Sequence, residues 1–446
     1  MIFALIVVPV LGLFVGVHRY LWCRLVRDTT TPGSRLRRTG TAAVFVLPLT
    51  TLAALPAERA GAPFGLQQAL AWPGYLWLAL VLYLTLALLV GEVVRAVALR
   101  ALRDRDREPA EEAPSAPAPS AAPAPAPCAA PAPAPSADPP RAASPDLPRA
   151  PSPSSAPTLL PPRTPALPPL AVPPRRLFLA RAVAAGASLA ATAAVGYGTA
   201  TTLRGPTVKR VTVPLAKLPR AAHGFRIAVV SDIHLGPTLG RAHTRRVVET
   251  INRTGPDLVA IVGDLVDGSV ADLAPAAEPL RGLRARHGAY FVTGNHEYYS
   301  GAAPWVDHIR ELGIHPLENA RTELPGFDLA GVNDVTGQTE HAGPDYDLAL
   351  GGRDPSRAVV LMAHQPVTIH DTVRFGVDLQ LSGHTHGGQM WPFTYVAAAT
   401  NPTVAGLERY GDTQLYVTRG AGAWGPPVRL GAPPDVTVVE LASLRA

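Results

Sequence analysis

Cysteine, lysine and charged residues are scarce in this 446-residue sequence, and each scarcity excludes a class of protein. The two cysteines, Cys23 and Cys128, are too few for a disulfide-rich scaffold or a cysteine-ligated zinc site. Lys209 and Lys217 are the only lysines, so the formal net charge of +6 comes almost entirely from arginine and does not indicate nucleic-acid binding. Only 17% of residues are charged while 47% are hydrophobic, which argues against a simple cytosolic enzyme.

Four apolar runs predict membrane helices. Three of them, over residues 1–17, 41–57 and 74–94, can each cross or nearly cross a hydrocarbon core about 30 Å thick. Buried core helices are the alternative, but three such runs in the first hundred residues leave little polar chain to enclose them. The fourth run, 177–202, follows Arg175 and Arg176 in a pattern that resembles either a twin-arginine export signal or an arginine-flanked membrane anchor.

The composition divides the chain into four segments. Residues 1–107 form a membrane region with three predicted transmembrane helices, and residues 108–174 form a Pro/Ala-rich linker that we expect to be disordered. Residues 175–203 form the fourth transmembrane helix or signal-like anchor, and residues 204–446 form a globular domain. Arginines after the first and third runs predict a cytoplasmic linker and an extracytoplasmic globular domain, whereas five basic residues between Arg204 and Arg220 argue the other way.

The globular segment alternates short apolar runs with helix-compatible stretches, which predicts an α/β fold. Buried strands are expected at residues 225–231, 257–263, 289–294, 358–363, 377–383 and 414–420. Helices are expected at 241–253 and 303–313, each ending at or near glycine.

Polar side chains follow five of these strands. In chain order they are Asp232 and His234, Asp264, Asn295 and His296, His364, and finally His384 and His386. Loops at the carboxyl ends of strands converge in α/β sheets, so these groups should meet. Carboxylates, imidazoles and an amide together suit manganese, iron, zinc or similar ions, and burying so polar a set without a metal would be costly.

The ordered motifs D-x-H, G-D, G-N-H-E, H and G-H-x-H resemble those of the calcineurin-like metallophosphoesterases, over roughly residues 225–440. GGQ at 387–389, TRGAG at 418–422 and PPVRLGAPPD at 426–435 further resemble the bacterial membrane-associated or exported branch of that family. The resemblance implies a two-sheet sandwich flanked by helices, here preceded by transmembrane helices and the Pro/Ala-rich linker.

The same resemblance implies two metal ions in adjacent positions. One would be held by Asp232, His234, Asp264 and His386, and the other by Asp264, Asn295, His364 and His384, with Asp264 bridging. A hydroxide bridging the two ions would attack phosphorus, and His296 would act as the acid or transition-state donor for the leaving oxygen. Glu297 is expected to support a ligand or begin a helix, and Asp267 to orient a ligand or cap a turn, of which we favour the turn.

The expected substrate is a phosphodiester, including lipid head groups or cell-envelope polymers, because the site would be tethered beside a membrane. Phosphomonoesters are the alternative substrate class. Asn333, Asp334, Trp391, Phe393, Trp424 and Arg429 are candidates for the substrate groove, although for Arg429 a surface ion pair is favoured. The other histidines lack motif support and are expected to be solvated or to cap turns.

Two readings of another class compete with the enzyme. A metal-binding scaffold or membrane regulator without catalysis should lack a ligand or the catalytic histidine, and none is missing here. A transporter or sensor with a phosphoesterase output should carry intramembrane charge, but Glu92 is nearly the only ionisable residue in the first three runs. We therefore expect the membrane region to be an anchor, and no nucleic-acid partner.

Overall fold

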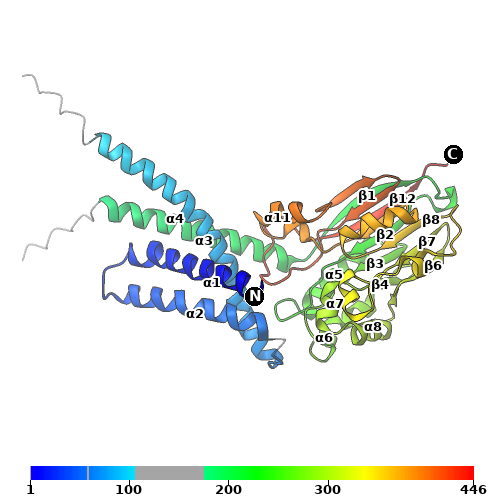
Figure 1. The fold of residues 1–446 in the computed structure, drawn as a ribbon, viewed down its shortest axis with the longest axis horizontal. Helices are drawn as coiled ribbons and strands as arrows, with labels where there is room; N and C mark the ends of the chain where they lie inside the picture. Colours follow the sequence, from blue (N-terminus) through cyan, green and yellow to red (C-terminus); the bar gives the residue numbers. More distant parts are fainter. Residues whose placement is uncertain (1, 58–59, 106–174, 446) are drawn as a thin grey trace, which may run out of the picture. The chain divides into compact units, whose positions relative to one another are not determined.

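The computed structural model describes residues 2–57, 60–105 and 175–445 (Figure 1). Met1–Ala96 and Arg175–Ala446 form one compact unit, and Val97–Pro174 forms the other. Within the second unit the structure describes only residues 97–105, which complete a helix that begins in the first unit. The predicted linker over 108–174, with Cys128, lies outside the described residues.

Each predicted apolar run lies within a long helix. These helices are α1 (Ile2–Leu21), continued by the π-helix Trp22–Arg27, α2 (Arg35–Ala57), α3 (Phe64–Arg105) and α4 (Arg175–Arg204). Among the described residues, three helical segments are long and apolar enough to cross a membrane: Arg35–Ala57, Phe64–Ala101 and Arg175–Arg204. Large apolar side chains such as Val93 and Leu189 are exposed on them, as expected for helices surrounded by hydrocarbon. The arginine pair of the signal-like motif forms the first turn of α4.

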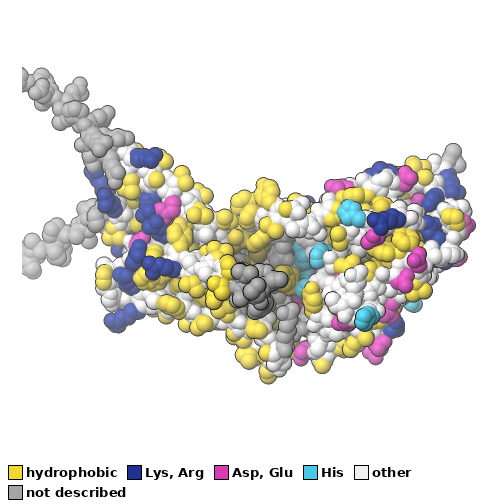
Figure 2. Space-filling view, in the orientation of Figure 1, with side chains coloured by type: hydrophobic (Ala, Val, Ile, Leu, Met, Phe, Trp, Pro, Cys, Tyr) yellow, Lys and Arg dark blue, Asp and Glu magenta, His cyan; other side chains and the backbone are white. Residues whose placement is uncertain are grey.

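Basic residues gather at one end of these helices. The carboxylate of Glu92 on α3 contacts Arg24 at 2.6 Å and Arg95 at 2.7 Å. On α4, Arg181 Nε donates to the Thr29 carbonyl at 3.0 Å, so the start of α4 lies beside the α1–α2 connection. Figure 2 shows the dark blue side chains grouped at this end of the helices.

Two sheets of six strands form the centre of the rest of the first unit. The first has the order β1 (Thr207–Leu215), β12 (Asp435–Ser443), β2 (Phe225–Val230), β3 (Leu258–Val262), β4 (Ala289–Val292) and β5 (His315–Pro316). The second has the order β10 (Gly406–Tyr410), β11 (Thr413–Val417), β9 (Leu379–Ser382), β8 (Ala358–Met362), β7 (Phe327–Gly331) and β6 (Ala320–Leu324). Neighbours from β2 to β5 and from β11 to β7 are parallel.

The core lies between the sheets, and helices cover their outer faces. Val229 and Val262 of the first sheet share one buried cluster with Leu329, Val360 and Leu381 of the second. Because side chains alternate along a strand, the opposite faces need their own cover. That cover comes from α5 (Arg241–Arg253), α6 (Val270–Ala277) and α8 (Ala302–Glu311) on the first sheet and from α9 (Tyr346–Leu350) on the second. The remaining helices are α7 (Asn295–Ser300), α10 (Ile369–Thr372) and α11 (Phe393–Thr400).

The expected fold class, a two-sheet α/β sandwich flanked by helices and preceded by apolar helices, is confirmed. All six expected strands are present, as β2, β3, β4, β8, β9 and β11, and the helix expected at 241–253 is α5. The other six strands were not expected. Among them, β1 and β12 pair along nine residues at one edge of the first sheet.

Candidate metal centre

The candidate ligands lie where strands of both sheets end. Asp232 and His234 follow β2, Asp264 follows β3, and Asn295 follows β4 as the first residue of α7. His364 follows β8, and His384 and His386 follow β9. The parallel strands of the two sheets therefore deliver their loops to one place, which is why residues 154 positions apart can meet.

The backbone is strained at five of these seven positions. Positive φ angles occur at Asp232 (52°), His234 (49°), Asp264 (53°), His384 (70°) and His386 (52°). A non-glycine residue in the left-handed region is uncommon and costs on the order of 1 kcal/mol, so it persists only when its surroundings demand it. Such strain concentrates at functional sites, and here it aims five polar side chains inward.

Two motif glycines allow the close approach of these loops. A Cβ atom on Gly294 would lie 2.2 Å from Asp264 Oδ1, and one on Gly383 would lie 2.5 Å from Asp232 Oδ2. Neither distance is sterically allowed. The glycine before Asn295 and the glycine before His384 are therefore needed so that the carboxylates can reach the centre of the site.

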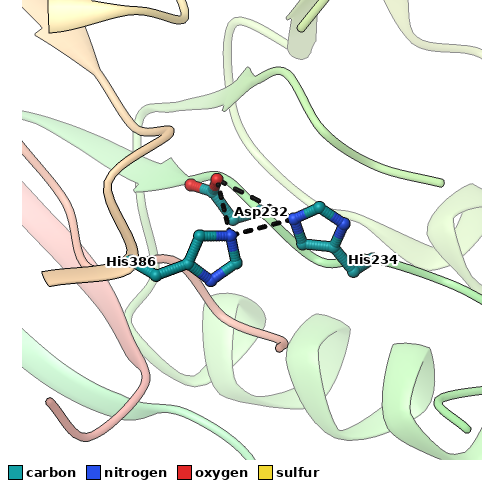
Figure 3. Close-up of side chains that lie close together, drawn as sticks. All are labelled: Asp232, His234 and His386. Carbon is teal, nitrogen blue, oxygen red and sulfur yellow. Dashed lines mark hydrogen bonds and ion pairs between the residues drawn. The ribbon is translucent and has the colours of Figure 1, made fainter. Parts of the chain in front are cut away.

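The first group of candidate ligands comprises Asp232, His234 and His386, all buried (Figure 3). The Nε2 atoms of the two histidines are 3.0 Å apart, and His386 Nε2 lies 3.3 Å from Asp232 Oδ1. One donor atom from each residue lies within 4.8 Å of the others, close enough to hold a metal ion.

The second group comprises Asp264, His364 and His384, again with donor atoms within 4.8 Å of one another. Asn295 belongs beside it, because its Oδ1 atom lies 3.0 Å from His384 Nδ1. Asp264 Oδ2 is 3.1 Å from His364 Nε2 in this group and 3.8 Å from His234 Nε2 in the first. Asp264 thus lies between the two groups, where the resemblance had placed a bridging ligand.

The contacts of His364 show that a cation fits this site. Its Nδ1 atom lies 2.8 Å from the Val262 carbonyl and donates to it, so Nε2 is the ring atom that faces the Asp264 carboxylate, at 3.1 Å. Without a metal, a second proton on the ring holds the two together, since burial by itself would lower the pKa of His364 but the charge of Asp264 raises it above its usual range; a metal cation can take the place of that proton. Burial by itself would raise the pKa of Asp264, but His364 and the neighbouring histidines hold that pKa well below the usual range. Asp264 is therefore anionic and suited to a metal.

Asp267 joins two histidines, so the favoured prediction of a turn cap was wrong. Its Oδ1 atom is 2.9 Å from His234 Nδ1 and 2.7 Å from His296 Nδ1. A carboxylate on Nδ1 leaves Nε2 of His234 free for the metal site and fixes the ring orientation. The second acid of GDLVDG was a signal for this role, but the sequence does not show that one carboxylate serves both rings.

His296 lies beside the candidate ligands and lines a cavity together with four of them, Asp264, Asn295, His384 and His386. Burial by itself would lower its pKa, but the hydrogen bond and charge of Asp267, together with Asp264, raise the pKa of His296 to about 9. The ring is therefore protonated at neutral pH and can donate. Its backbone N–H also donates to Asp264 Oδ1 at 2.9 Å, which ties the position of His296 to that of the central carboxylate.

Glu297 supports the ligand Asp264, as expected, and lies in the first turn of α7. Its fully buried carboxylate accepts hydrogen bonds from the backbone N–H groups of Asp264 (3.0 Å), Leu265 (2.7 Å) and Gly294 (2.6 Å). These three bonds fix the turn after β3 against the start of α7.

Arg429 is fully buried, which contradicts the surface ion pair favoured for it and also its alternative place in the substrate groove. Its guanidinium donates to the carbonyls of Gly422 (2.7 Å), His386 (2.8 Å) and Arg419 (2.8 Å), and Nη2 lies 3.0 Å from His386 Nδ1. Arg429 therefore holds the His386 loop in place. Nothing in the order of residues 426–435 distinguished a buried arginine from an exposed one.

Of the other residues expected in the substrate groove, some line a cavity at the metal centre or beside it and some do not. Trp424 lines the cavity around the metal centre, and Phe393 lines a second cavity beside it. Asp334 is buried and accepts from Gln365 Nε2 at 3.0 Å, while Asn333 donates to the Ala342 carbonyl, so both organise loops. Trp391 is exposed and does not line either cavity, although its carbonyl is used in a contact with α3.

Comparison with known proteins supports the same chemistry. The family model described as calcineurin-like phosphoesterase matches residues 225–388. A "Transmembrane protein with metallophosphoesterase domain" of Danio rerio is 38% identical over 259 residues, which cover 55% of this chain and 59% of that protein. The protein of the same name in Bos taurus is 40% identical over 253 residues, which cover 53% of this chain and 57% of that protein. The chain thus spans less than two thirds of the length of these animal relatives.

A bacterial relative is matched almost completely. The "Uncharacterized metallophosphoesterase YkuE" of Bacillus subtilis is 32% identical, with 60% of this chain and 98% of that protein covered. Among solved structures, the calcineurin-like phosphoesterase YfkN of Bacillus subtilis is 14% identical, with a TM-score of 0.28 over 44% of this chain and 88% of that chain.

The relatives include both animal and bacterial proteins, so they do not single out the bacterial exported branch. The names of the animal relatives and the three long apolar helices indicate membrane association. With the matched family model, the extensive match to a full-length relative and the paired ligand groups, the chain belongs to the calcineurin-like metallophosphoesterase family.

Proposed function

We propose that the protein is a dinuclear-metal phosphodiesterase of the membrane. The observation that carries this proposal is the position of Asp264, whose carboxylate lies within 4 Å of a histidine from each ligand group. Two metals that share one carboxylate are about 3.5 to 4 Å apart, the arrangement that enzymes use for in-line displacement at phosphorus. Asp232, His234, Asp264 and His386 would hold one ion, and Asp264, Asn295, His364 and His384 the other.

The bound ions would supply a nucleophilic hydroxide near neutral pH and neutralise charge on the phosphoryl oxygens. The chain's own residues supply the rest. His296, protonated through its contact with Asp267, donates a proton to the leaving oxygen as the phosphorus–oxygen bond breaks. Asp267 holds the His234 and His296 rings in one orientation, and Glu297 holds the Asp264 backbone.

A multi-pass arrangement is supported by the long helices, three of which, among the described residues, are apolar enough to cross a membrane. Arg24, Arg95 and Arg181 lie at the end where α1, α3 and α4 gather their basic residues, and this end is placed in the cytoplasm by the positive-inside rule. The chain leaves α4 at its other end and enters β1 directly. We therefore place the catalytic domain on the extracytoplasmic side, where membrane or envelope phosphodiesters are available as substrates.

The test uses the full chain in lipid nanodiscs. Elemental analysis should find about two transition metals per chain, and added Mn²⁺ should support hydrolysis of bis(p-nitrophenyl) phosphate more efficiently than of p-nitrophenyl phosphate. Preference for the monoester would replace the diesterase with a phosphomonoesterase. A folded, metal-loaded protein that is inert on both compounds would leave the metal-binding scaffold as the better account.

The pH dependence of hydrolysis should show the proton on His296. On a diester with an alkoxide leaving group, which needs the proton, kcat/KM should be maintained below the pKa of His296 and fall as the pH rises through it, at a value no higher than about 9. Bound cations repel a positive imidazolium and would therefore shift this fall in kcat/KM to lower pH. Asp267→Asn removes the charge that raises the pKa of His296, so it should shift the fall in kcat/KM to lower pH by about one unit or more. If Asp267→Asn retains its metal and kcat/KM still falls at the same pH as in the wild type, His296 is not the proton donor.

A further inference from the structure

We propose that the substrate carries a long hydrocarbon chain, which binds in an apolar cavity between the membrane helices and the metal centre. This inference rests on the proposed phosphodiesterase function and deepens it. The catalytic cavity, about 660 Å³, contains Asp264, Asn295 and His296. A second cavity of about 650 Å³, named here the apolar cavity, lies beside it.

The two cavities share part of their walls at the metal centre. His384 and His386, Trp424 and Pro426, and Leu78 of α3 line both of them. A phosphorus atom bound at the metals would therefore have one substituent directed toward each cavity. A diester is the simplest compound that has two such substituents.

The far wall of the apolar cavity consists mostly of hydrocarbon side chains, with Thr85, Thr400 and Asn401 as its polar members. It includes Val81 and Leu82 of α3 and Phe393, Val396 and Ala397 of α11. Helix α3 is one of the segments long and apolar enough to span a membrane, so this wall belongs to an element that lipid surrounds. A cavity of this volume is of the size that binds small organic ligands, and its lining would favour a hydrocarbon over a sugar or a nucleoside.

Specific contacts hold the helices against the catalytic loops. Tyr83 of α3 is buried and donates its hydroxyl hydrogen to the Trp391 carbonyl at 2.9 Å. The backbone N–H of Arg429 donates to the Gly198 carbonyl of α4 at 3.0 Å. The two segments are so close here that a Cβ atom on Gly198 would lie 2.5 Å from Val428 Cγ1. Met390 and Val428 also belong to the buried cluster formed by α1, α3 and α4. The apolar cavity is thus bounded by parts of one packed unit.

Helix α11 has the composition of a segment at a membrane surface. Phe393 and Tyr395 within it and Trp391 just before it are all exposed, and Trp and Tyr are enriched where hydrocarbon meets water. A lipid that remains partly in the membrane could then extend its chain between α3 and α11 while its phosphoester group reaches His384 and His386.

The test compares two diesters with the same leaving group, methyl p-nitrophenyl phosphate and octyl p-nitrophenyl phosphate, the latter below its micelle concentration. With full-length protein in nanodiscs, kcat/KM should be roughly 10-fold or more higher for the octyl ester, since several buried methylene groups contribute to binding. Partition of the octyl ester into the bilayer could also raise this ratio, so a matched pair of variants is required.

Ala397→Trp and Ala398→Trp make that pair. Both residues lie on α11, but only Ala397 lines the apolar cavity, whereas Ala398 is exposed and does not line it. Ala397→Trp should bring the octyl-to-methyl ratio close to one, and Ala398→Trp should keep the wild-type ratio because partition is the same for both. The same ratio in all three proteins, or a wild-type ratio near one, would overturn the proposal.

Failure of the proposed function has a separate signature, since then neither ester is hydrolysed. In that case an alkylphosphonate with a photoactivatable diazirine at its chain end, in the presence of Mn²⁺, tests the cavity without turnover. Labelling of α3 and α11 that is lost in Ala397→Trp but kept in Ala398→Trp would support the lipid site. Labelling that is equal in both variants would overturn it.

Discussion

Asp264→Asn is expected to reduce hydrolysis by roughly 10³-fold or more and to lower the metal content to one ion or fewer per chain. The carboxylate of Asp264 faces His364 Nε2 at 3.1 Å and His234 Nε2 at 3.8 Å, and no other described side chain lies between the two ligand groups in this way. Asparagine preserves the shape and can still accept the His296 N–H, but it brings no negative charge to be shared between two cations. Elemental analysis and initial rates on the full chain are the measurements.

The matched control is Asp307→Asn on α8. The side chain of Asp307 is 73% exposed and pairs with Arg310 on the helix surface, so its replacement should change neither metal content nor rate. Because the Asp264 turn is strained, the variant also needs an unfolding measurement. A folded Asp264→Asn protein that keeps two ions and its activity would overturn the bridging assignment.

The candidate site was more predictable from the sequence than its supporting contacts. Each ligand belongs to a short motif directly after a strand, and the order of strands in parallel sheets brings such motifs together. The roles of Asp267 and Arg429 depend instead on which distant group each side chain reaches. That information is set by tertiary packing and has no local pattern.

The fold likewise has elements that the sequence predicts and elements that it does not. Central strands such as β3, with the sequence LVAIV, are buried on both faces and produce a continuous apolar run. The edge strand β1, with the sequence TVKRVTVPL, has exposed positions and basic residues, so its apolar signal is weak. The long helices were evident from hydropathy, but the hydrogen bond from Tyr83 to Trp391 joins positions 308 residues apart. Hydropathy contains no information about such a contact.

His296→Ala is expected to lower the rate by roughly 10²-fold or more on diesters with an alkoxide leaving group, while both metal ions are retained. The imidazole is absent from both proposed ligand sets, and its Nδ1 atom is engaged by Asp267 at 2.7 Å. Its contribution is a proton for the leaving oxygen, and an alkoxide depends on that proton because it is a strong base. A p-nitrophenolate is stable as an anion, so the same variant should lose much less activity on bis(p-nitrophenyl) phosphate.

The difference between the two leaving groups separates proton donation from a structural role. Loss of packing around His296, including its edge contact with Trp424 at 5.7 Å between ring centroids, would lower both rates equally. His370→Ala, at an exposed histidine of α10, controls for the loss of an imidazole elsewhere and should leave both rates unchanged. Equal losses on both leaving groups in His296→Ala, with metals retained, would make His296 a positioning residue. A loss confined to the poor leaving group instead requires that the proton on His296 Nε2 reaches the departing oxygen while Asp267 holds Nδ1–H.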